Sequence, residues 1–279
     1  MGAQISSVCL TLAGFAGHVS LAGNKGRGVL FDIFLIFGAA FLAGIVNTIA
    51  GGGTFLTFPA LVFVGLPPIV ANATSSVAVL PGYLSGALGY APEVRAFDRR
   101  VFLRLCGVTV AGGVVGAIAL LVSSNELFAA VVPFLLLIAT VVFYWGGPIR
   151  AFVAKYSANV TPFGSVSLFV VAVYGGYFNG GLGIILLALF AMWGMSNVHE
   201  MNGLKTSLSF VVSAISVVIF AAAGIVAWSQ ALIMMVGALL GGYLGAPIAR
   251  ALPQSWVRVG IALTGLTMSL IFMWRAFII

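Results

Sequence analysis

Long apolar runs, almost free of charged residues, follow one another along most of this 279-residue chain. Only 6% of its residues are charged and 62% are hydrophobic, whereas a soluble domain carries about 25% charged residues. Such a chain needs lipid as its solvent, and lipid leaves only helices or closed barrels, because every backbone polar group must find a partner inside the protein. The apolar runs are continuous rather than alternating. They predict an all-α, polytopic helical membrane protein.

The lengths of the apolar runs predict how the chain crosses the membrane. One helical crossing needs about 20 apolar residues. Eight segments reach this length, and we expect transmembrane helices at residues 29–50, 70–90, 101–122, 126–147, 163–182, 203–225, 229–250 and 255–278. Segments 54–66 and 184–194 are also apolar but too short to cross comfortably, and each follows a glycine cluster. We expect both to be re-entrant or broken half-helices.

Basic residues gather in the loops between these segments. They include Lys25, Arg27, Arg95, Arg99, Arg100, Arg150 and Lys155. Basic loops mark the cytoplasmic side of a membrane protein, so the net charge of +7 points to topology and not to a nucleic-acid partner. With eight crossings, both termini are expected to be cytoplasmic. Arg250 and Arg258 are the exception, because the same topology places them outside.

Two glycine-rich stretches resemble each other and indicate an internal duplication. The first has Asn47 before Gly51-Gly52-Gly53 and leads to Thr74-Ser75; the second has Asn179 before Gly180-Gly181 and leads to Thr206-Ser207. The spacing from asparagine to threonine is the same in both. A further match places Gly112–Ala117 opposite Gly241–Ala246. Glycine-broken segments at corresponding positions of two halves point to the central binding site of a transporter.

The duplication predicts four parts of the chain. These are an N-terminal extension (1–28), a first transmembrane repeat (29–147), a basic linker (148–162) and a second transmembrane repeat (163–279). With four crossings per repeat, both repeats start on the same side of the membrane and are parallel. With five, the second repeat starts on the opposite side and is inverted. The eight expected crossings favour parallel repeats.

The polar groups near the two broken regions are mostly hydrogen-bond donors. A broken helix exposes unpaired N–H groups and the positive end of its dipole. Lys205 is the one cation near either motif, and no acidic residue lies in the middle of an expected span. Such a set favours an anion, because hard metal cations need oxygen ligands, often carboxylates. The expected substrate-binding residues are Asn47, Gly51, Gly52, Gly53, Thr74, Ser75, Asn179, Lys205, Thr206 and Ser207.

Enzymatic motifs are nearly absent from the chain. His18 and His199 lie far apart, and no Gly-Lys-Ser/Thr follows Gly51–Gly53 to make a phosphate loop. Cys9 and Cys106 are interpreted as packing residues. We therefore expect no catalytic residue, metal or cofactor. A passive anion channel and a membrane-embedded enzyme or sensor are the alternatives to a transporter.

The motifs resemble those of the sulfite exporter TauE/SafE family, also called the 4-toluene sulfonate uptake permease family. The resemblance rests on Ala43-Gly44, Gly51-Gly52-Gly53, Pro59-Ala60-Leu61, Gly65 and Ala73-Thr74-Ser75, and on Gly180, Gly181 and Gly183 followed by Lys205-Thr206-Ser207. Ile184 and Ile185 depart from it, because many members carry more glycine there.

The resemblance implies a bacterial or archaeal inner-membrane protein that moves small sulfur-containing anions such as sulfite, sulfoacetate and other organosulfonates. We expect a secondary transporter of such an anion, acting as an exporter by alternating access between the two broken regions. Its expected partners are the small anion and membrane lipid, and homo-oligomerisation is left open.

Overall fold

The described part of the chain is all-helical, as the composition predicted. The computed structural model describes residues 28–49, 52–145, 163–251 and 254–277. Within these ranges the chain forms eleven helices and no strand. The expected linker 148–162, and the expected N-terminal extension apart from Gly28, lie outside the described residues.

The helices follow the predicted segments closely. The first half contains α2 (Val29–Ile49), α3 (Thr54–Phe63), α4 (Pro68–Gly89), α5 (Ala91–Arg95), α6 (Arg99–Val122) and α7 (Asn125–Tyr144). The second half contains α9 (Ser165–Tyr177), α10 (Leu182–Met192), α11 (Val198–Ala222), α12 (Trp228–Ala251) and α13 (Gln254–Phe277). The exception is the span expected at 163–182. Its helix α9 has 13 residues and is about 20 Å long, too short for a bilayer core.

Among the described residues, four helices are long and apolar enough to cross a membrane by length and composition. They are α2, α6, α7 and α11, over residues 29–47, 99–122, 125–142 and 199–222. Shorter apolar stretches lie in α3, α9, α10, α12 and α13. The remaining long helix, α4, carries the polar run Asn72–Ser76. These helices confirm a polytopic helical membrane protein.

Polar caps set where several long helices begin. Asp98 Oδ1 accepts the N–H groups of Arg100 and Val101 at the start of α6, at 2.8 and 3.0 Å. Ser124 Oγ accepts the N–H of Leu127 at the start of α7, at 3.1 Å. Such caps satisfy N–H groups that have no acceptor inside the helix. They fix short turns between consecutive helices.

Helices α4 and α11 cross in opposite directions. The rings of Tyr90, which follows α4, and His199, in the first turn of α11, lie 6.5 Å apart. At the other end, the N–H of Ala227, five residues after the end of α11, donates to Thr74 Oγ1 in the first half of α4, at 3.0 Å. The end of each helix therefore meets the start of the other.

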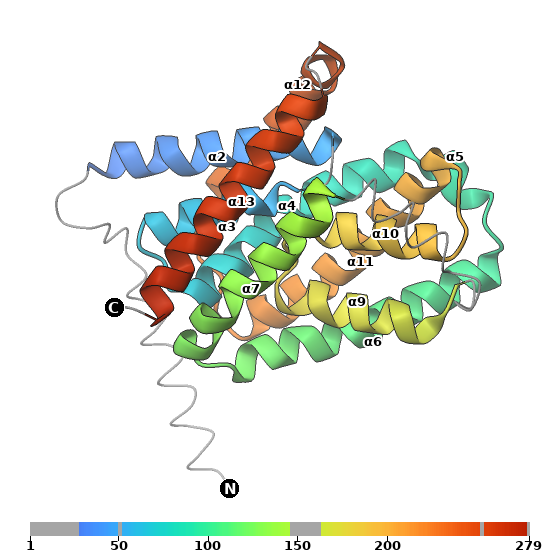
Figure 1. Cartoon of the computed structure of the whole chain (residues 1–279), viewed down its shortest axis with the longest axis horizontal. Coiled ribbons are helices and arrows are strands. Elements are labelled where there is room, and N and C mark those ends of the chain that lie inside the picture. Colours follow the sequence, from blue (N-terminus) through green and yellow to red (C-terminus); the bar gives the residue numbers. More distant parts are fainter. Residues whose placement is uncertain (1–27, 50–51, 146–162, 252–253, 278–279) are drawn as a thin grey trace, which may run out of the picture.

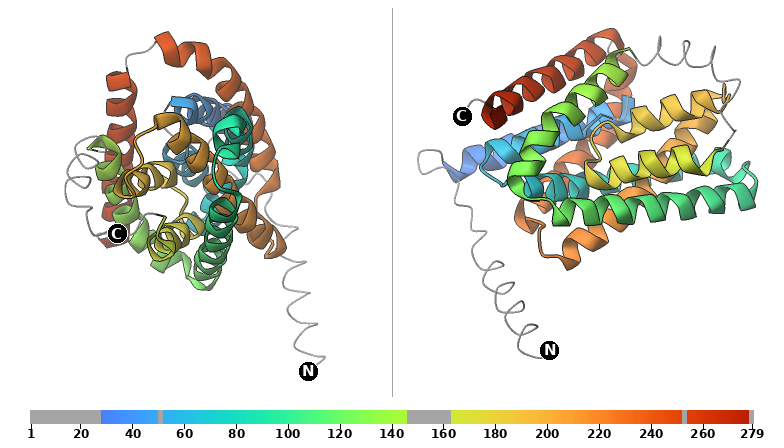
Figure 2. Two further views of the ribbon diagram at one scale, coloured as in Figure 1. Left: turned by 90° about the vertical axis from the view of Figure 1, so that its right-hand side faces the viewer. Right: turned by 60° about the horizontal axis from the view of Figure 1, so that its bottom comes forward.

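Glycines allow the first helix of each half to pack closely against a helix of the other half. Helix α2 has its most extensive contact with α12, and α9 has its most extensive contact with α6; Figure 2 shows α6 and α9 side by side. A Cβ added at Gly44 would meet the backbone of Ala238 and Gly242, and a Cβ added at Gly176 would meet the backbone of Gly113. The two halves are therefore interlocked.

The same contacts correct the register of the predicted repeat. A Cβ added at Gly112 would lie 2.7 Å from the carbonyl oxygen of Phe169, and one added at Gly237 would lie 2.7 Å from that of Phe37. Gly112 therefore corresponds to Gly237, and its predicted match with Gly241 is wrong by one helical turn. Small residues recur at every fourth position in both helices, so a shift of four residues preserves the pattern.

The prediction of parallel repeats is also wrong. Helix α4 corresponds to α11, α6 to α12 and α7 to α13. The first pair is antiparallel, as shown above. In the last pair Ser269 Oγ donates to Pro133 O at 2.7 Å, and a Cβ added at the earlier Gly265 would meet the later Thr140. The short helices explain the difference, because α3 and α10 return the chain to the end from which α2 and α9 enter (Figure 1). Each half then makes three net passes along the helix bundle.

The helix bundle has two chemically different ends. At one end Arg104 Nη2, in the first turns of α6, donates to Phe163 O just before α9, at 3.3 Å. Exposed Arg95, Arg99 and Arg100 lie at this end, which we call the basic end. At the other end the N–H of Ile69, in α4, donates to Asn125 Oδ1 at the start of α7, at 3.4 Å. We call this the Asn125 end.

Replacing the glycines at the interlocking contacts should destabilise the protein. We expect Gly44→Ala and Gly176→Ala each to cost about 1–3 kcal/mol, because the new methyl group overpacks a backbone contact. Gly38→Ala and Gly107→Ala are matched controls, since a Cβ at either position meets no atom within 4 Å. Thermal unfolding of the purified protein in detergent measures the effect. Equal melting temperatures for all four variants would contradict the interlocking contacts.

Candidate functional site

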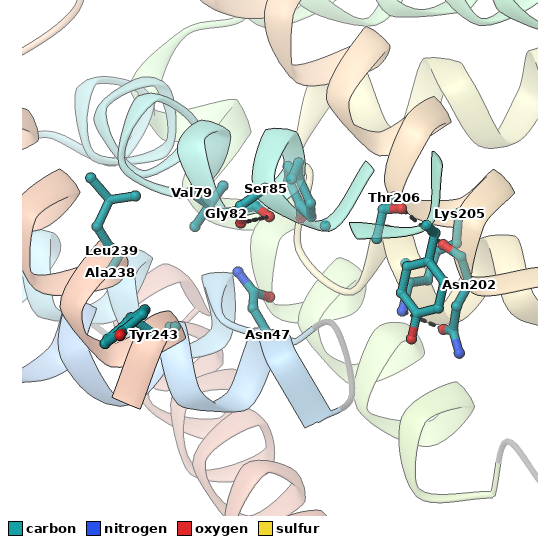
Figure 3. A pocket seen from close by; sticks show the side chains of 16 residues that line it. Asn47, Val79, Gly82, Ser85, Asn202, Lys205, Thr206, Ala238, Leu239 and Tyr243 are labelled. Carbon is teal, nitrogen blue, oxygen red and sulfur yellow. Dashed lines mark hydrogen bonds between the residues drawn. The ribbon is translucent and has the colours of Figure 1, made fainter. Parts of the chain in front are cut away.

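A cavity of about 700 Å³ lies between the two halves of the protein (Figure 3). Helices α2 and α4 line it from the first half, and α10, α11 and α12 line it from the second. Its polar lining residues are Asn47, Tyr83, Ser85, Tyr90, Asn202, Lys205, Thr206 and Tyr243. None of the described lining residues is a carboxylate. Ser85 and Tyr243 are exposed, so the cavity reaches the protein surface.

Lys205 brings a positive charge to the cavity. Its side chain is 8% exposed, and its Nζ donates to Asn202 Oδ1 at 2.9 Å. Within the described part of the chain this amide is the only hydrogen-bond partner of the ammonium group. Burying a charge with one neutral partner costs free energy. An anion in the cavity would offset that cost.

Asn47 lines the cavity and also lies at the first helix break. Its Oδ1 accepts the N–H of Gly53 at 2.8 Å, which ties the end of α2 to the start of α3. The same bond leaves its Nδ2 as a donor, and a Cβ added at Gly82 across the cavity would lie 3.9 Å from that nitrogen. Figure 3 shows Asn47 and the Asn202–Lys205 pair on two sides of the cavity. Donors therefore reach it from both halves.

The second helix break brings the start of α10 to the cavity. Gly181 precedes α10 in a left-handed conformation (φ 70°), which glycine adopts without strain. Gly183 lies in the first turn of α10 and lines the cavity. N–H groups in the first turn of a helix have no intrahelical acceptor and lie at the positive end of its dipole. This position suits an anion.

Three of the expected binding residues line the cavity and a fourth adjoins it. Asn47, Lys205 and Thr206 are lining residues, and Gly53 is bonded to Asn47. The hydroxyl of Thr206 donates back to Asn202 O at 2.9 Å and so is not a free donor. Gly52 is buried and is not among the described lining residues. Gly51 lies outside the described residues.

Four other expected residues lie outside the cavity. Thr74 accepts the N–H of Ala227, the hydroxyl of Ser75 lies 2.6 Å from that of Thr57, and Asn179 Nδ2 donates to Ser213 Oγ at 3.0 Å. Ser207 is buried in α11. None of the four is among the described residues that line the cavity. Since α4 and α11 are antiparallel, the matching Thr74 and Thr206 lie toward opposite ends of the bundle.

The cavity also contains residues that were not in the expected set. They are Tyr83, Ser85 and Tyr90 from the second half of α4 and its end, Asn202 from α11 and Gly183 from α10. Asn202 and Gly183 belong to the second glycine motif, so the sequence carried a signal for them. The α4 residues have no such signal. They become recognisable only once α4 and α11 are known to be antiparallel.

The known proteins that match the chain indicate membrane transport. A family model described as Sulfite exporter TauE/SafE matches residues 36–272. A probable membrane transporter protein, ORF9, of Sinorhizobium sp. is 30% identical over 218 residues, which are 77% of this chain and 82% of that protein. A probable membrane transporter protein of Haemophilus influenzae is 26% identical over 236 residues, 84% of this chain and 92% of that protein. No solved structure matches the chain.

Substitutions at Asn47 should separate its structural role from its role in the cavity. We expect Asn47→Ala to cost about 1–3 kcal/mol of stability, because the Gly53 N–H loses its acceptor. Asn47→Asp keeps an acceptor oxygen but places a carboxylate in the cavity, so we expect near-normal stability and lost anion binding. Thermal unfolding and anion-binding calorimetry on both variants measure the two effects. Unchanged anion binding in Asn47→Asp would remove Asn47 from the site.

Proposed function

Because the chain belongs to the sulfite exporter TauE/SafE family, we propose that it exports a small sulfur-containing oxyanion, such as a sulfonate or sulfite, as a secondary transporter. The protein is a multi-pass membrane transporter and not an enzyme. The environment of Lys205 is the main reason to propose an anionic substrate. Lys205 is a buried cation with one neutral hydrogen-bond partner, and the described lining of its cavity has no carboxylate.

The donors around the cavity match the chemistry of a sulfonate. Such a group presents three oxygens that share a negative charge. Lys205 Nζ, Asn47 Nδ2 and the N–H of Gly183 come from three different helices and can each donate a hydrogen bond. Ligand pockets commonly have volumes of about 300–1,000 Å³, so a cavity of about 700 Å³ has room for a small organosulfonate with water.

The position of the cavity supports alternating access. One wall comes from α2 and α4 and the other from α10, α11 and α12. Movement of one half against the other therefore changes the shape of the cavity. Transporters built from inverted repeats use this motion, with broken helices at the binding site.

The distribution of basic residues supports an orientation in the membrane. Arg95, Arg99 and Arg100 are exposed at the basic end. Helix α12 starts near the Asn125 end, directly after Ala227. Positive charge marks the cytoplasmic side. We propose that the basic end is cytoplasmic; the start of α2 and the end of α13 are then outside, in place of the cytoplasmic termini expected from eight crossings.

Removing the charge of Lys205 should weaken anion binding. We expect Lys205→Met to lower the affinity for a small sulfonate roughly tenfold or more, because a hydrogen bond to a charged group contributes about 1.5–3 kcal/mol. Lys205→Arg should retain part of the affinity. Arg95→Gln is the matched control, because it removes one positive charge outside the cavity. Calorimetry with sulfite, sulfoacetate, taurine, sulfate, phosphate and acetate measures affinity and selectivity. Equal affinity in Lys205→Met and Arg95→Gln would contradict the site.

Flux measurements distinguish a transporter from the alternatives. We expect purified protein in liposomes to exchange a labelled sulfonate across the membrane with saturable kinetics and to show counterflow. A channel would conduct the anion without saturation or counterflow. A sensor would bind it without flux. Either result would contradict the proposed transport mechanism.

The orientation can be tested by labelling single cysteines. In a background with Cys9→Ala and Cys106→Ala, we expect Ala96→Cys, at the basic end, to react with a membrane-impermeant thiol reagent only from the cytoplasmic side. Glu126→Cys, at the Asn125 end, should react only from outside. Both positions are exposed, so failure to react reports sidedness and not burial. The reverse pattern would place the basic end outside.

A further inference from the structure

Two polar residues that line the cavity have buried counterparts in the other half. Asn47 is partly exposed, whereas its counterpart Asn179 is 2% exposed. Thr206 is partly exposed, whereas its counterpart Thr74 is fully buried. In each of these two matched pairs, one polar residue lies at the cavity and its counterpart is enclosed.

The third helix of each half shows the same difference. With Gly112 matched to Gly237, the cavity-lining Gly242 on α12 corresponds to Ala117 on α6. A Cβ added at Gly242 would meet no atom within 4 Å, whereas Ala117 is completely buried. Ala238, which also lines the cavity, corresponds to Gly113, where an added Cβ would lie 2.8 Å from the side chain of Ile215 on α11. Helices α6 and α11 are therefore packed together where α12 and α4 are separated by the cavity.

Contacts around Tyr177 close the second site toward the Asn125 end. Asn72 Nδ2 donates to Tyr177 O at 2.9 Å, and the hydroxyl of Tyr177 lies 3.4 Å from that of Ser123. The rings of Tyr177 and Phe128 lie 5.5 Å apart. These contacts join α4, α6 and α7 to the end of α9. They must break if the second site is to open.

Buried polar atoms in this region lack partners. Asn179 Oδ1, Ser209 Oγ and Ser216 Oγ are buried and have no hydrogen-bond partner within the described chain. Ser209, Ser213 and Ser216 recur at helical spacing on one face of α11, and Asn179 bonds to Ser213. Dry packing leaves such groups unsatisfied at a cost in free energy. Water or an anion would satisfy them if the region opened.

We propose that Asn179, Ser213, Ser216 and Ala117, which we call the Asn179 seam, form a second anion half-site that opens to the Asn125 end when the Lys205 cavity closes. In that state Asn179 takes the role that Asn47 has in the open cavity. Ala73 stands at the counterpart position of Lys205, so the seam recognises the oxyanion through neutral donors alone. This inference rests on the proposed transport of an anion.

Thiol accessibility tests the seam directly. Ser213→Cys, Ser216→Cys and Ala117→Cys are made singly in the background without Cys9 and Cys106, and an impermeant methanethiosulfonate reagent is added from either side of the membrane. We expect each seam cysteine to react from the side of the Asn125 end, at least tenfold faster than Ala139→Cys, a control on α7 that is fully buried. Ser85→Cys, at an exposed position that lines the cavity in the second half of α4, should react from the side of the basic end if the Lys205 cavity opens there.

The outcomes separate this inference from the proposed function. Three positions on two helices are tested, and gel filtration confirms that each variant is folded. Reaction rates no faster than that of Ala139→Cys, in folded variants that still transport the anion, would overturn the second half-site. Reaction of the seam only from the side of the basic end would also overturn it, because the seam would then belong to the first cavity. Absence of anion flux in the unsubstituted protein would instead contradict the proposed function, and it is measured separately.

Discussion

The fold depends on contacts that each half makes with the backbone near the broken helix of the other half. A broken helix leaves backbone polar groups without partners, and lipid cannot satisfy them. The break between α9 and α10 is covered from the first half, where Asn72 donates to Tyr177 O. The break between α2 and α3 is bridged by Asn47, and α12 packs closely against Gly44 just before it. Each break therefore has contacts with the other half.

Most of the fold was predictable from the sequence, because the length of an apolar run and its flanking polar residues determine where a helix lies. The half-helices α3 and α10 begin and end close to the predicted segments 54–66 and 184–194. The relation between the halves was not predictable in this way. It depends on whether a short helix returns the chain to its starting side, and on a glycine register that repeats at every turn. Both are decided by contacts between residues far apart in the chain.

The same relation explains why only part of the expected site came together. The two copies of the motif suggested one site containing both threonines, Thr74 and Thr206. Because α4 and α11 are antiparallel, Thr206 and Lys205 lie by the open cavity with Asn47, while Thr74 is held by the N–H of Ala227 beyond the other end of α11. The expected residues do not form one site. Their division between two places follows from helix direction.

A structure with a bound brominated sulfonate would test the central claim most directly. The claim is that an anion binds between the two halves beside the buried ammonium group of Lys205. Crystals grown with 2-bromoethanesulfonate should show an anomalous bromine peak inside the cavity, with a sulfonate oxygen within hydrogen-bonding distance of Lys205 Nζ. A peak only at the protein surface, or no peak at a concentration that saturates binding in solution, would contradict the account.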